Sequence, residues 1–393
     1  GPDRFRTIFH AHECATARHI VEHHDGHDTM FYNVLHQARE QGKYVDDVFA
    51  DDIAGHFRHA IISLSHTCDA VMAVGDYTAD EMHFLGRHFD HHDIELVYNG
   101  VPAFPVTLRK RNAARKMLTE YTEAILGFTP DVLMSHVTRP VISKGLWRDV
   151  QVCGELDRHF GEQGINGVLY ILTSGGGVRR PQDVKHMEAE YGWPADHRFG
   201  YPDLTGPEED LWRMIEPFNA KHDNVKIVLV NQFGWTRDRI GKRLPEKMNL
   251  GDFRTATDVE FGMATYEPFG ISPLEPLGSG AVCVISNVCG CEGFVEYVTK
   301  GKPTDNVLVA DYTQLERTWS IDELKAMTRE DRNRIESVES ARIAAELMQR
   351  IPLDNPARKA LIESGQKLVS KMGWDQVVEH KLLSVLERIT NHK

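Results

Sequence analysis

The sequence predicts an α/β protein with two Rossmann-like domains that face a central cleft, and three observations lead to this prediction. Strand-like and helix-like segments alternate along most of the chain, which is typical of parallel sheets with crossover helices. Several strand-like runs are apolar throughout and rich in β-branched residues, as strands buried on both faces are. The alternation is interrupted between residues 103 and 127 and therefore forms two series.

The first series contains three expected strands and two expected helices. Apolar residues at helical spacing predict a helix over residues 46–66, and the residues that repeat are Val48, Ile53, Phe57 and Ile61. Thr78, a capping residue with Glu81 three positions later, predicts a second helix that ends near Leu85. The expected strands are Thr7–Phe9, Ala70–Val74 and Leu96–Tyr98.

A basic run from Leu108 to Lys116 follows the first series. We interpret it as a solvent-exposed helix at the junction between the domains, and a binding site for a phosphate-bearing effector is the alternative. The junction divides the chain into a first domain of residues 1–127 and a second domain of residues 128–373. Residues 374–393 form a C-terminal helical segment of their own.

The second series contains five expected strands and a helical end. Four X-Pro or Gly-Pro breaks in residues 178–222 indicate an insertion or a long functional loop. Ser320 begins a capping box, and the helices after it are expected to end at Arg350 and to run from Pro356 to about Lys371. A final amphipathic helix is expected over Trp374–Ile389. The expected strands are Val132–Met134, Gly167–Leu172, Val225–Val230, Ala281–Ile285 and Val307–Val309.

The composition excludes several classes of protein. The 393 residues include 45 Lys+Arg and 58 Asp+Glu, a net charge of −13, which argues against binding to nucleic acid or to anionic membranes. No apolar run approaches the roughly 18 residues that span a bilayer. The six cysteines contain no CxxC pair, so we expect reduced thiols and a cytoplasmic location. The Gly1-Pro2 start is typical of a cleaved expression tag, and we expect natural residues ahead of Asp3 to be missing.

Histidines are concentrated in the first domain, where 14 of the 21 lie between His10 and His92. A metal site is one interpretation of this concentration. The spacings contain no HExxH motif and no His/Cys quartet, so we expect mostly solvent-exposed histidines and no bound metal.

The segment from Tyr266 to Gly280 is the strongest candidate for a functional site. It carries two carboxylates, Glu267 and Glu275, with Gly270, Ile271 and Ser272 between them. A helix that begins near Ser272-Pro273 would direct the N–H groups of these three residues at an anion such as a diphosphate. Glu275 would then accept hydrogen bonds from a ribose diol, and Glu267 would reach a sugar hydroxyl or the reacting carbon. Incidental surface glutamates on a strand–loop–helix unit are the alternative.

A second candidate element follows the expected strand at Val132–Met134. Arg139 and Lys144 would place two cations at the carboxyl end of this strand. Cations at that place would neutralise the charge that builds up on a departing diphosphate.

These elements together resemble the retaining glycosyltransferases with two Rossmann domains, the GT-B fold, and most closely the glycogen and starch synthases. Glu267–Glu275 resembles the family's E-P-[FW]-G-x-x-P-x-E segment, and Arg139–Gly145 has the spacing of its R-x4-K-G motif. The first domain resembles the animal and fungal glycogen synthase branch. The other stretches that carry the resemblance are Thr7–Glu13, Phe31–Asn33, Asp93–Val101, Ser286–Phe294 and Trp374–Ile389.

The resemblance implies transfer of glucose from UDP- or ADP-glucose to a glucan, with retention at the anomeric carbon and without a metal, since the chain has no DxD motif. The donor is a substrate, and no cofactor is implied. Glu267, Arg139 and Lys144 would act in catalysis, with His10 or His12 contacting the sugar. Phe233 and Trp235 would flank the base, although core packing explains them equally well.

The resemblance also implies that the N-terminal domain is partial. The family's glycine-rich Lys-x-Gly-Gly loop is missing, and the glycine cluster Ser174–Gly177 lies in the second domain and lacks the residues of a P-loop. The C-terminal helix is expected to cross back to the N-terminal domain. A small or lipid-linked acceptor, a non-catalytic nucleotide-sugar-binding subunit and a homo-oligomer are open alternatives.

Overall fold

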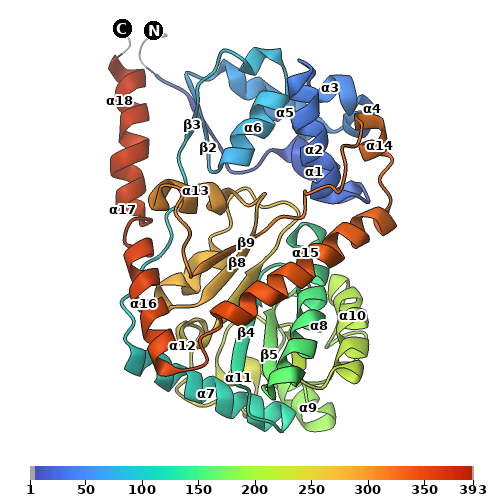
Figure 1. Ribbon diagram of the computed structural model, residues 1–393, viewed down its shortest axis with the longest axis vertical. Helices are drawn as coiled ribbons and strands as arrows, with labels where there is room; N and C mark the ends of the chain where they lie inside the picture. Colours follow the sequence, from blue (N-terminus) through green and yellow to red (C-terminus); the bar gives the residue numbers. More distant parts are fainter. Residues whose placement is uncertain (1–4, 392–393) are drawn as a thin grey trace.

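The computed structural model describes residues 5–391 and consists of two lobes, each built around a parallel sheet (Figure 1). The Gly1-Pro2 start lies outside the described residues. The first lobe contains the three-stranded sheet and helices α1 to α6, and the second lobe contains the six-stranded sheet.

The first lobe has the strand order β1-β2-β3, and all pairs are parallel. Its strands are β1 (Ile8–Ala11), β2 (Ala70–Ala73) and β3 (Ile94–Leu96). Its helices are α1 (Ala15–His23), α2 (His27–Glu40), α3 (Val45–Val48), α4 (Ala50–Ile53), α5 (Phe57–Ser63) and α6 (Asp76–Phe84). Short 3-10 turns cover Leu64–Thr67 and Arg87–Phe89. The three predicted strands are confirmed with boundaries shifted by at most two residues.

The predicted helix over residues 46–66 is wrong. The segment is divided into α3, α4, α5 and a 3-10 turn, with Gly55 in the left-handed conformation at φ +75° between α4 and α5. This conformation ends the helical rise, so the residues after it turn to a different face. Phe57 and Ile61 are consequently 68% and 61% exposed instead of packing in the core.

The second lobe has the strand order β6-β5-β4-β7-β8-β9, all parallel. Counted from its own first strand, this is 3-2-1-4-5-6, the doubly wound order. The strands are β4 (Val132–Val137), β5 (Gly167–Leu172), β6 (Val225–Val230), β7 (Val259–Gly262), β8 (Val282–Ser286) and β9 (Val307–Ala310). The strand β7 was not predicted, because this four-residue strand carries the charged Glu260.

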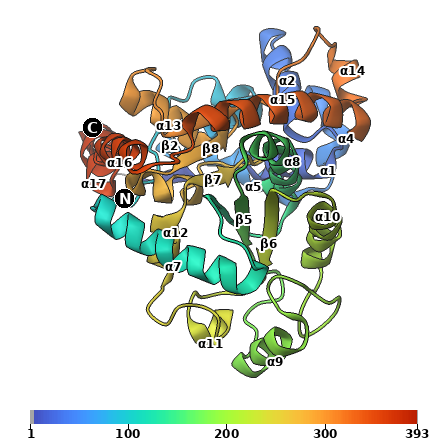
Figure 2. The same cartoon turned by 60° about the horizontal axis from the view of Figure 1, so that its bottom comes forward.

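Helices cover both faces of this sheet (Figure 2). One face packs against α8 (Leu146–Gln163), α10 (Pro207–Lys221) and α15 (Arg329–Arg350). The other packs against α7 (Leu108–Leu126), α9 (Pro181–Tyr191), α11 (Arg237–Ile240) and α12 (Leu250–Ala256). Residues 178–222 are therefore not a long loop: they contain α9 and α10, and α10 belongs to the crossover from β5 to β6.

The basic run predicted to be solvent-exposed is partly buried. It lies in α7, where Arg111 and Arg115 both contact the buried carboxylate of Asp258; the Arg111 Nη2–Asp258 Oδ1 distance is 2.9 Å. The two guanidinium groups thus serve as internal partners of a buried acid. Neither is available to bind an effector from solution.

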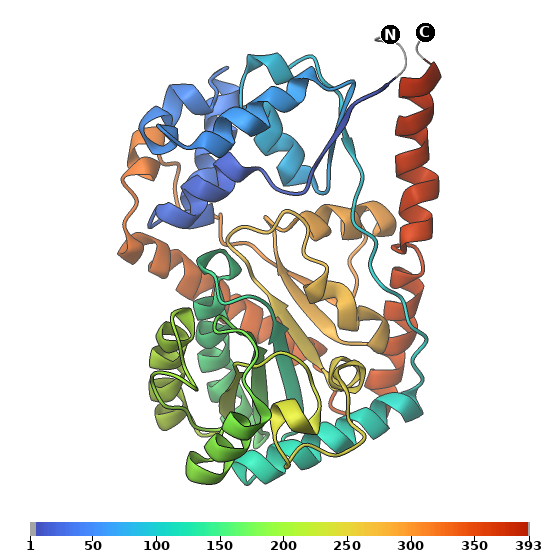
Figure 3. The same cartoon turned by 180° about the vertical axis from the view of Figure 1, so that it is seen from behind.

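The chain returns to the first lobe twice. Leu315, Trp319 and Leu324 pack with the first-lobe core, around α14 (Ile321–Lys325). The C-terminal helices run along one side of both lobes (Figure 3), and Arg388 Nη1 lies 2.6 Å from Glu95 Oε1 of β3. These helices are α16 (Asn355–Val369), α17 (Trp374–Val377), a π-helical turn (Val378–Leu382) and α18 (Leu383–Asn391).

Among residues 5–391, no helix combines the length and the apolar character needed to cross a membrane.

Candidate active site

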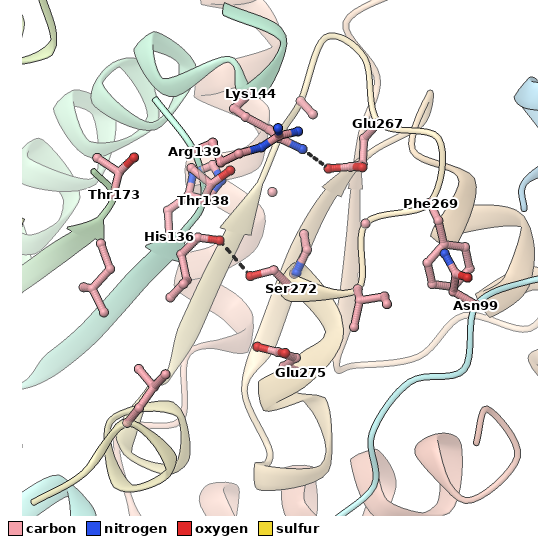
Figure 4. Close-up of a pocket in the computed structure, with 18 of the residues that line it drawn as sticks. Asn99, His136, Thr138, Arg139, Lys144, Thr173, Glu267, Phe269, Ser272 and Glu275 are labelled. Atoms are coloured by element: carbon pink, nitrogen blue, oxygen red, sulfur yellow. Dashed lines mark hydrogen bonds and ion pairs between the residues drawn. The ribbon is translucent and has the colours of Figure 1, made fainter. Parts of the chain in front are cut away.

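A cavity of about 620 Å³ lies at the carboxyl ends of β4 and β7. These neighbouring strands mark the point where the strand order of the second lobe reverses, which is where doubly wound sheets bind ligands. Most of the lining comes from the second lobe, and His12 and Asn99 line the cavity from the first-lobe side. The cavity thus has walls from both lobes (Figure 4).

The two predicted cations both line this cavity. Arg139 is exposed and follows β4 directly, and the half-buried Lys144 directs its ammonium group at the carboxylate of Glu267 (Figure 4). Gly145 makes this placement feasible: at φ +61° a methyl group there would lie 2.5 Å from the carbonyl oxygen of Met263. The close approach of these backbones holds Lys144 beside the loop that follows β7.

The segment between the two predicted glutamates forms one wall of the cavity. Gly270, at φ +83°, turns the chain, and Gly270, Ile271 and Ser272 all line the space. The Ser272 hydroxyl donates to the carbonyl oxygen of Val137 at 2.7 Å, which ties this turn to the end of β4.

The predicted α-helix after this turn is a 3-10 helix over Ser272–Ser279. Pro273 and Pro276 lack N–H groups and therefore interrupt α-helical hydrogen bonding. Glu275 is exposed and lies 3.2 Å from Arg254, and Arg254 also lies 2.8 Å from the buried Glu260.

The two candidate histidines, His10 and His12, have different environments. His12 lines the cavity, whereas the His10 Nε2 atom lies 3.0 Å from the carbonyl oxygen of Val97. Burial, together with the neighbouring His12, lowers the pKa of His10. His12 is therefore the histidine placed to meet a ligand.

The two aromatic candidates also differ. Phe233 is 54% exposed at the cavity, so its ring is available to a planar ligand. Trp235 reaches the cavity wall but is only 3% exposed and packs against Tyr121 and Phe253 in the core. Trp235 thus supports the site from behind.

Several lining residues were not predicted. His136, Thr138 and Thr173 lie at the ends of β4 and β5 and line the cavity. The buried His136 Nδ1 atom lies 2.6 Å from Asp149 Oδ2, which orients the ring. The sequence did carry a signal for these residues, because polar residues at or just after the end of a predicted buried strand lie at the carboxyl edge of the sheet.

The glycine cluster Ser174–Gly177 does not form an open anion site. The N–H groups of Gly175 and Gly176 donate to Glu208 Oε1 at 2.7 and 3.0 Å, and Glu208 is itself buried beside Arg179. An internal carboxylate thus occupies the position that an external anion would take.

Within the part of the chain that the structure describes, no three His, Cys, Asp or Glu side chains are grouped so that they could hold a metal ion.

No protein-family model matches the sequence, and a search of curated proteins found no match. Among solved structures, α,α-trehalose 6-phosphate synthase from Burkholderia multivorans aligns with a TM-score of 0.51 at 12% identity, over 92% of this chain and 68% of that chain. A trehalose-6-phosphate structure from E. coli bound with UDP-2-fluoro glucose aligns with a TM-score of 0.48 at 11% identity, over 85% of this chain and 63% of that one. Sucrose-phosphate synthase from Thermosynechococcus elongatus has a TM-score of 0.48 at 16% identity, over 86% and 62%.

At these identities the likeness concerns the fold alone. The chain has the GT-B fold of two Rossmann-like domains, as the two parallel sheets and the doubly wound order of the second indicate. It spans less than two-thirds of the length of the last two structures, 63% and 62%.

Proposed function

We propose that the chain is a glycosyltransferase that binds a nucleotide-sugar in the 620 Å³ cavity and transfers its hexosyl group to a carbohydrate acceptor. The observation that carries the proposal is the composition of the cavity. Two cations, a glycine turn and two carboxylates from separate parts of the sequence meet where the doubly wound sheet binds ligands.

In this proposal Arg139, Lys144 and the turn at Gly270–Ser272 hold the donor diphosphate. Their positive charge and N–H groups stabilise the negative charge that develops as the diphosphate leaves. Lys144 contacts Glu267 in the free protein. A bound diphosphate replaces Glu267 as the partner of Lys144 and leaves the Glu267 carboxylate to face the sugar.

The remaining assignments follow the same geometry. Glu275 accepts from the ribose hydroxyls, with Arg254 fixing its position at 3.2 Å. Phe233 packs against the base, and His12 contacts the sugar from the first lobe. From the motif resemblance we propose glucose from UDP- or ADP-glucose, retention of anomeric configuration, a glucan acceptor and no metal. All six cysteines are free thiols, which is compatible with the proposed cytoplasmic location.

Nucleotide binding tests the donor site. Thermal unfolding is measured with millimolar UDP or ADP on the wild type, on Lys144→Ala and on Lys116→Ala, a control at an exposed lysine of α7. A ligand at 100 times its Kd stabilises the folded state by about 2.7 kcal/mol. We expect stabilisation of the wild type and of Lys116→Ala, and its loss in Lys144→Ala. If neither nucleotide stabilises the wild type, the proposal is wrong.

Product analysis tests the reaction. The protein is incubated with radiolabelled UDP- or ADP-glucose and glucan, with and without EDTA, and the anomeric configuration of the product is determined. We expect an elongated, α-linked glucan in both conditions. A small labelled product would instead indicate a small or lipid-linked acceptor, and binding without transfer would indicate a non-catalytic subunit.

A further inference from the structure

Tyr266, the residue before Glu267, belongs to the second lobe in sequence but packs inside the first. It follows β7, is buried, and lies in the same apolar cluster as Phe31 and Met82 of helices α2 and α6. The backbone that carries Glu267 therefore starts from an anchor in the opposite lobe.

The hydroxyl of Tyr266 is held by three hydrogen-bonding atoms of the first lobe. The Cys14 N–H group donates to it at 2.8 Å, and the Cys14 carbonyl oxygen lies 3.1 Å away. Glu81 Oε2, from the buried side of α6, also lies 3.1 Å away. The other oxygen of Glu81 accepts from the Tyr32 hydroxyl at 2.8 Å.

A neutral Glu81 fits these contacts. A neutral Glu81 donates its proton to the Tyr266 oxygen, and Tyr266 then donates its own proton to the Cys14 carbonyl oxygen. Each donor has one acceptor in this arrangement. The Cys14 carbonyl oxygen also accepts from the Arg18 N–H group at 3.0 Å, so the proton count alone admits both forms. Glu81 is only 2% exposed and forms no ion pair with a cation among residues 5–391, and a buried carboxyl group without a cation is more stable in its neutral form.

The surroundings of Glu81 also favour the neutral form. The charged groups acting on it include the carboxylates of Asp80, on the same helix, and of Glu13, next to Cys14. The Cys14 thiol and the two tyrosines that face Glu81 are themselves neutral, since burial raises their pKa. Burial raises the pKa of Glu81 to about 8, against the hydrogen bonds from Tyr32 and Tyr266, which lower it.

The residue before α6, Gly75, packs against Pro268, which follows Glu267 in the chain. A methyl group at Gly75, directly before α6, would lie 2.5 Å from the carbonyl oxygen of Pro268. Gly290, at the start of α13 (Gly290–Thr299), meets the same oxygen from the second lobe, and its N–H group donates to the Glu267 carbonyl oxygen at 3.0 Å. The two chain neighbours of Glu267 are thus both held by the first lobe. Tyr266 contacts Glu81 of α6, and Pro268 contacts Gly75, the residue before α6.

We propose that Glu81 and Tyr266 are positioning residues for Glu267, with Glu81 acting as a neutral carboxylic acid that anchors Tyr266 in the first lobe. The assignment of Glu267 to the reaction rests on the proposed function, whereas the protonation state of Glu81 does not. Ionisation of Glu81 leaves an unpaired charge buried between the lobes, so alkaline pH weakens the contact between the lobes at the active site.

The protonation state is tested by unfolding temperature against pH, which requires no activity. Glu81→Gln replaces the acid by an amide whose N–H donates to Tyr266 and whose oxygen accepts from Tyr32. The folded pKa of Glu81 is raised, so its contribution is full below pH 4.5 and is lost as pH rises to about 8. We expect equal Tm values for wild type and Glu81→Gln at pH 4, and a wild-type Tm that falls progressively below that of Glu81→Gln as pH rises to 8. A Glu81→Gln protein that is less stable than wild type at every pH would show that the ionised form is required, and would overturn the proposal.

The positioning role is tested by comparing Tyr266→Phe with Tyr32→Phe. Each variant removes one hydrogen bond to Glu81, but only Tyr266 adjoins Glu267. We expect a larger fall in Tm for Tyr266→Phe, which also leaves the Cys14 N–H group without its acceptor, than for Tyr32→Phe. We also expect a loss of about tenfold in kcat for Tyr266→Phe with an unchanged donor KM, and an unchanged kcat for Tyr32→Phe. Equal effects of the two variants on kcat would contradict positioning. Absence of nucleotide binding and transfer in the wild type would refute the proposed function, while the comparison of Tm against pH would still decide the state of Glu81.

Discussion

The buried ion cluster around Arg148 is predicted to hold the two lobes together, and a substitution at Arg148 tests this prediction. Arg148, in α8 of the second lobe, lies 2.7 Å from Asp28 of α2 in the first lobe and 2.8 Å from Glu336 of α15. All three side chains are inaccessible to solvent, and the guanidinium also stacks 3.9 Å from the ring centre of Tyr312. One cation therefore neutralises two buried carboxylates from different parts of the fold.

Replacing Arg148 by methionine keeps most of the side-chain volume and leaves Asp28 without its cation, whereas Glu336 keeps only Arg332, 3.6 Å away. Removing one partner of a buried ion pair costs about 3–5 kcal/mol, and here Asp28 loses its cation entirely. The total stability of a folded protein is about 5–15 kcal/mol. We therefore expect Arg148→Met to lower the free energy of unfolding by at least about 3 kcal/mol, which is a large part of the total stability.

Urea unfolding followed by tryptophan fluorescence and by far-UV circular dichroism measures this loss. Arg158→Met is the matched control, because Arg158 lies on the same helix with 57% of its side chain exposed and pairs with Glu155 and Glu162. Exposed pairs contribute about 0–1 kcal/mol. If Arg148→Met loses no more free energy of unfolding than Arg158→Met, the cluster does not join the lobes and the reasoning is wrong.

Three further predictions concern stability. Gly290→Ala places a methyl group against the Pro268 carbonyl oxygen and should cost about 1–3 kcal/mol in thermal unfolding, whereas Gly154→Ala, whose nearest contact is 3.9 Å away, should cost nothing. Asp258→Asn leaves the two buried arginines of α7 without their carboxylate, so we expect a loss of about 3–5 kcal/mol in the free energy of unfolding measured with urea. A loss below about 1 kcal/mol would contradict this prediction. Burial lowers the pKa of His27 to about 4, so the contribution of His27 to stability is lost as pH decreases from about 6.5 to 4. His27→Asn should remove this contribution and change the slope of Tm against pH in that range, and an unchanged slope would contradict the prediction.

The elements that sequence analysis placed well are those with local signals. The apolar runs at Gly167–Leu172 and Val225–Val230 became β5 and β6 within the same bounds, because a strand buried on both faces must be apolar over its whole length. The motif resemblance also grouped Arg139, Lys144, Glu267 and Gly270, and the structure brings all four to one cavity, since β4 and β7 end at the same edge of the sheet.

Elements whose structure depends on distant partners could not be placed in this way. The strand β7 contains Glu260, which is tolerated in the core because Arg254 of α12 lies 2.8 Å from it. The failed helix over residues 46–66 had suitable apolar spacing, but Gly55 ends the helical rise before Phe57.

The sequence by itself determined the alternation of strands and helices in the second lobe, because hydrophobic periodicity, glycine and proline act locally. Only the tertiary structure decided that His12 and not His10 faces the cavity, that Arg111 is an internal partner, and that Glu81 meets Tyr266. Burial and charge pairing depend on residues far apart in the chain, and Glu81 and Tyr266 are 185 positions apart. Such environments exist only once both lobes have folded against each other.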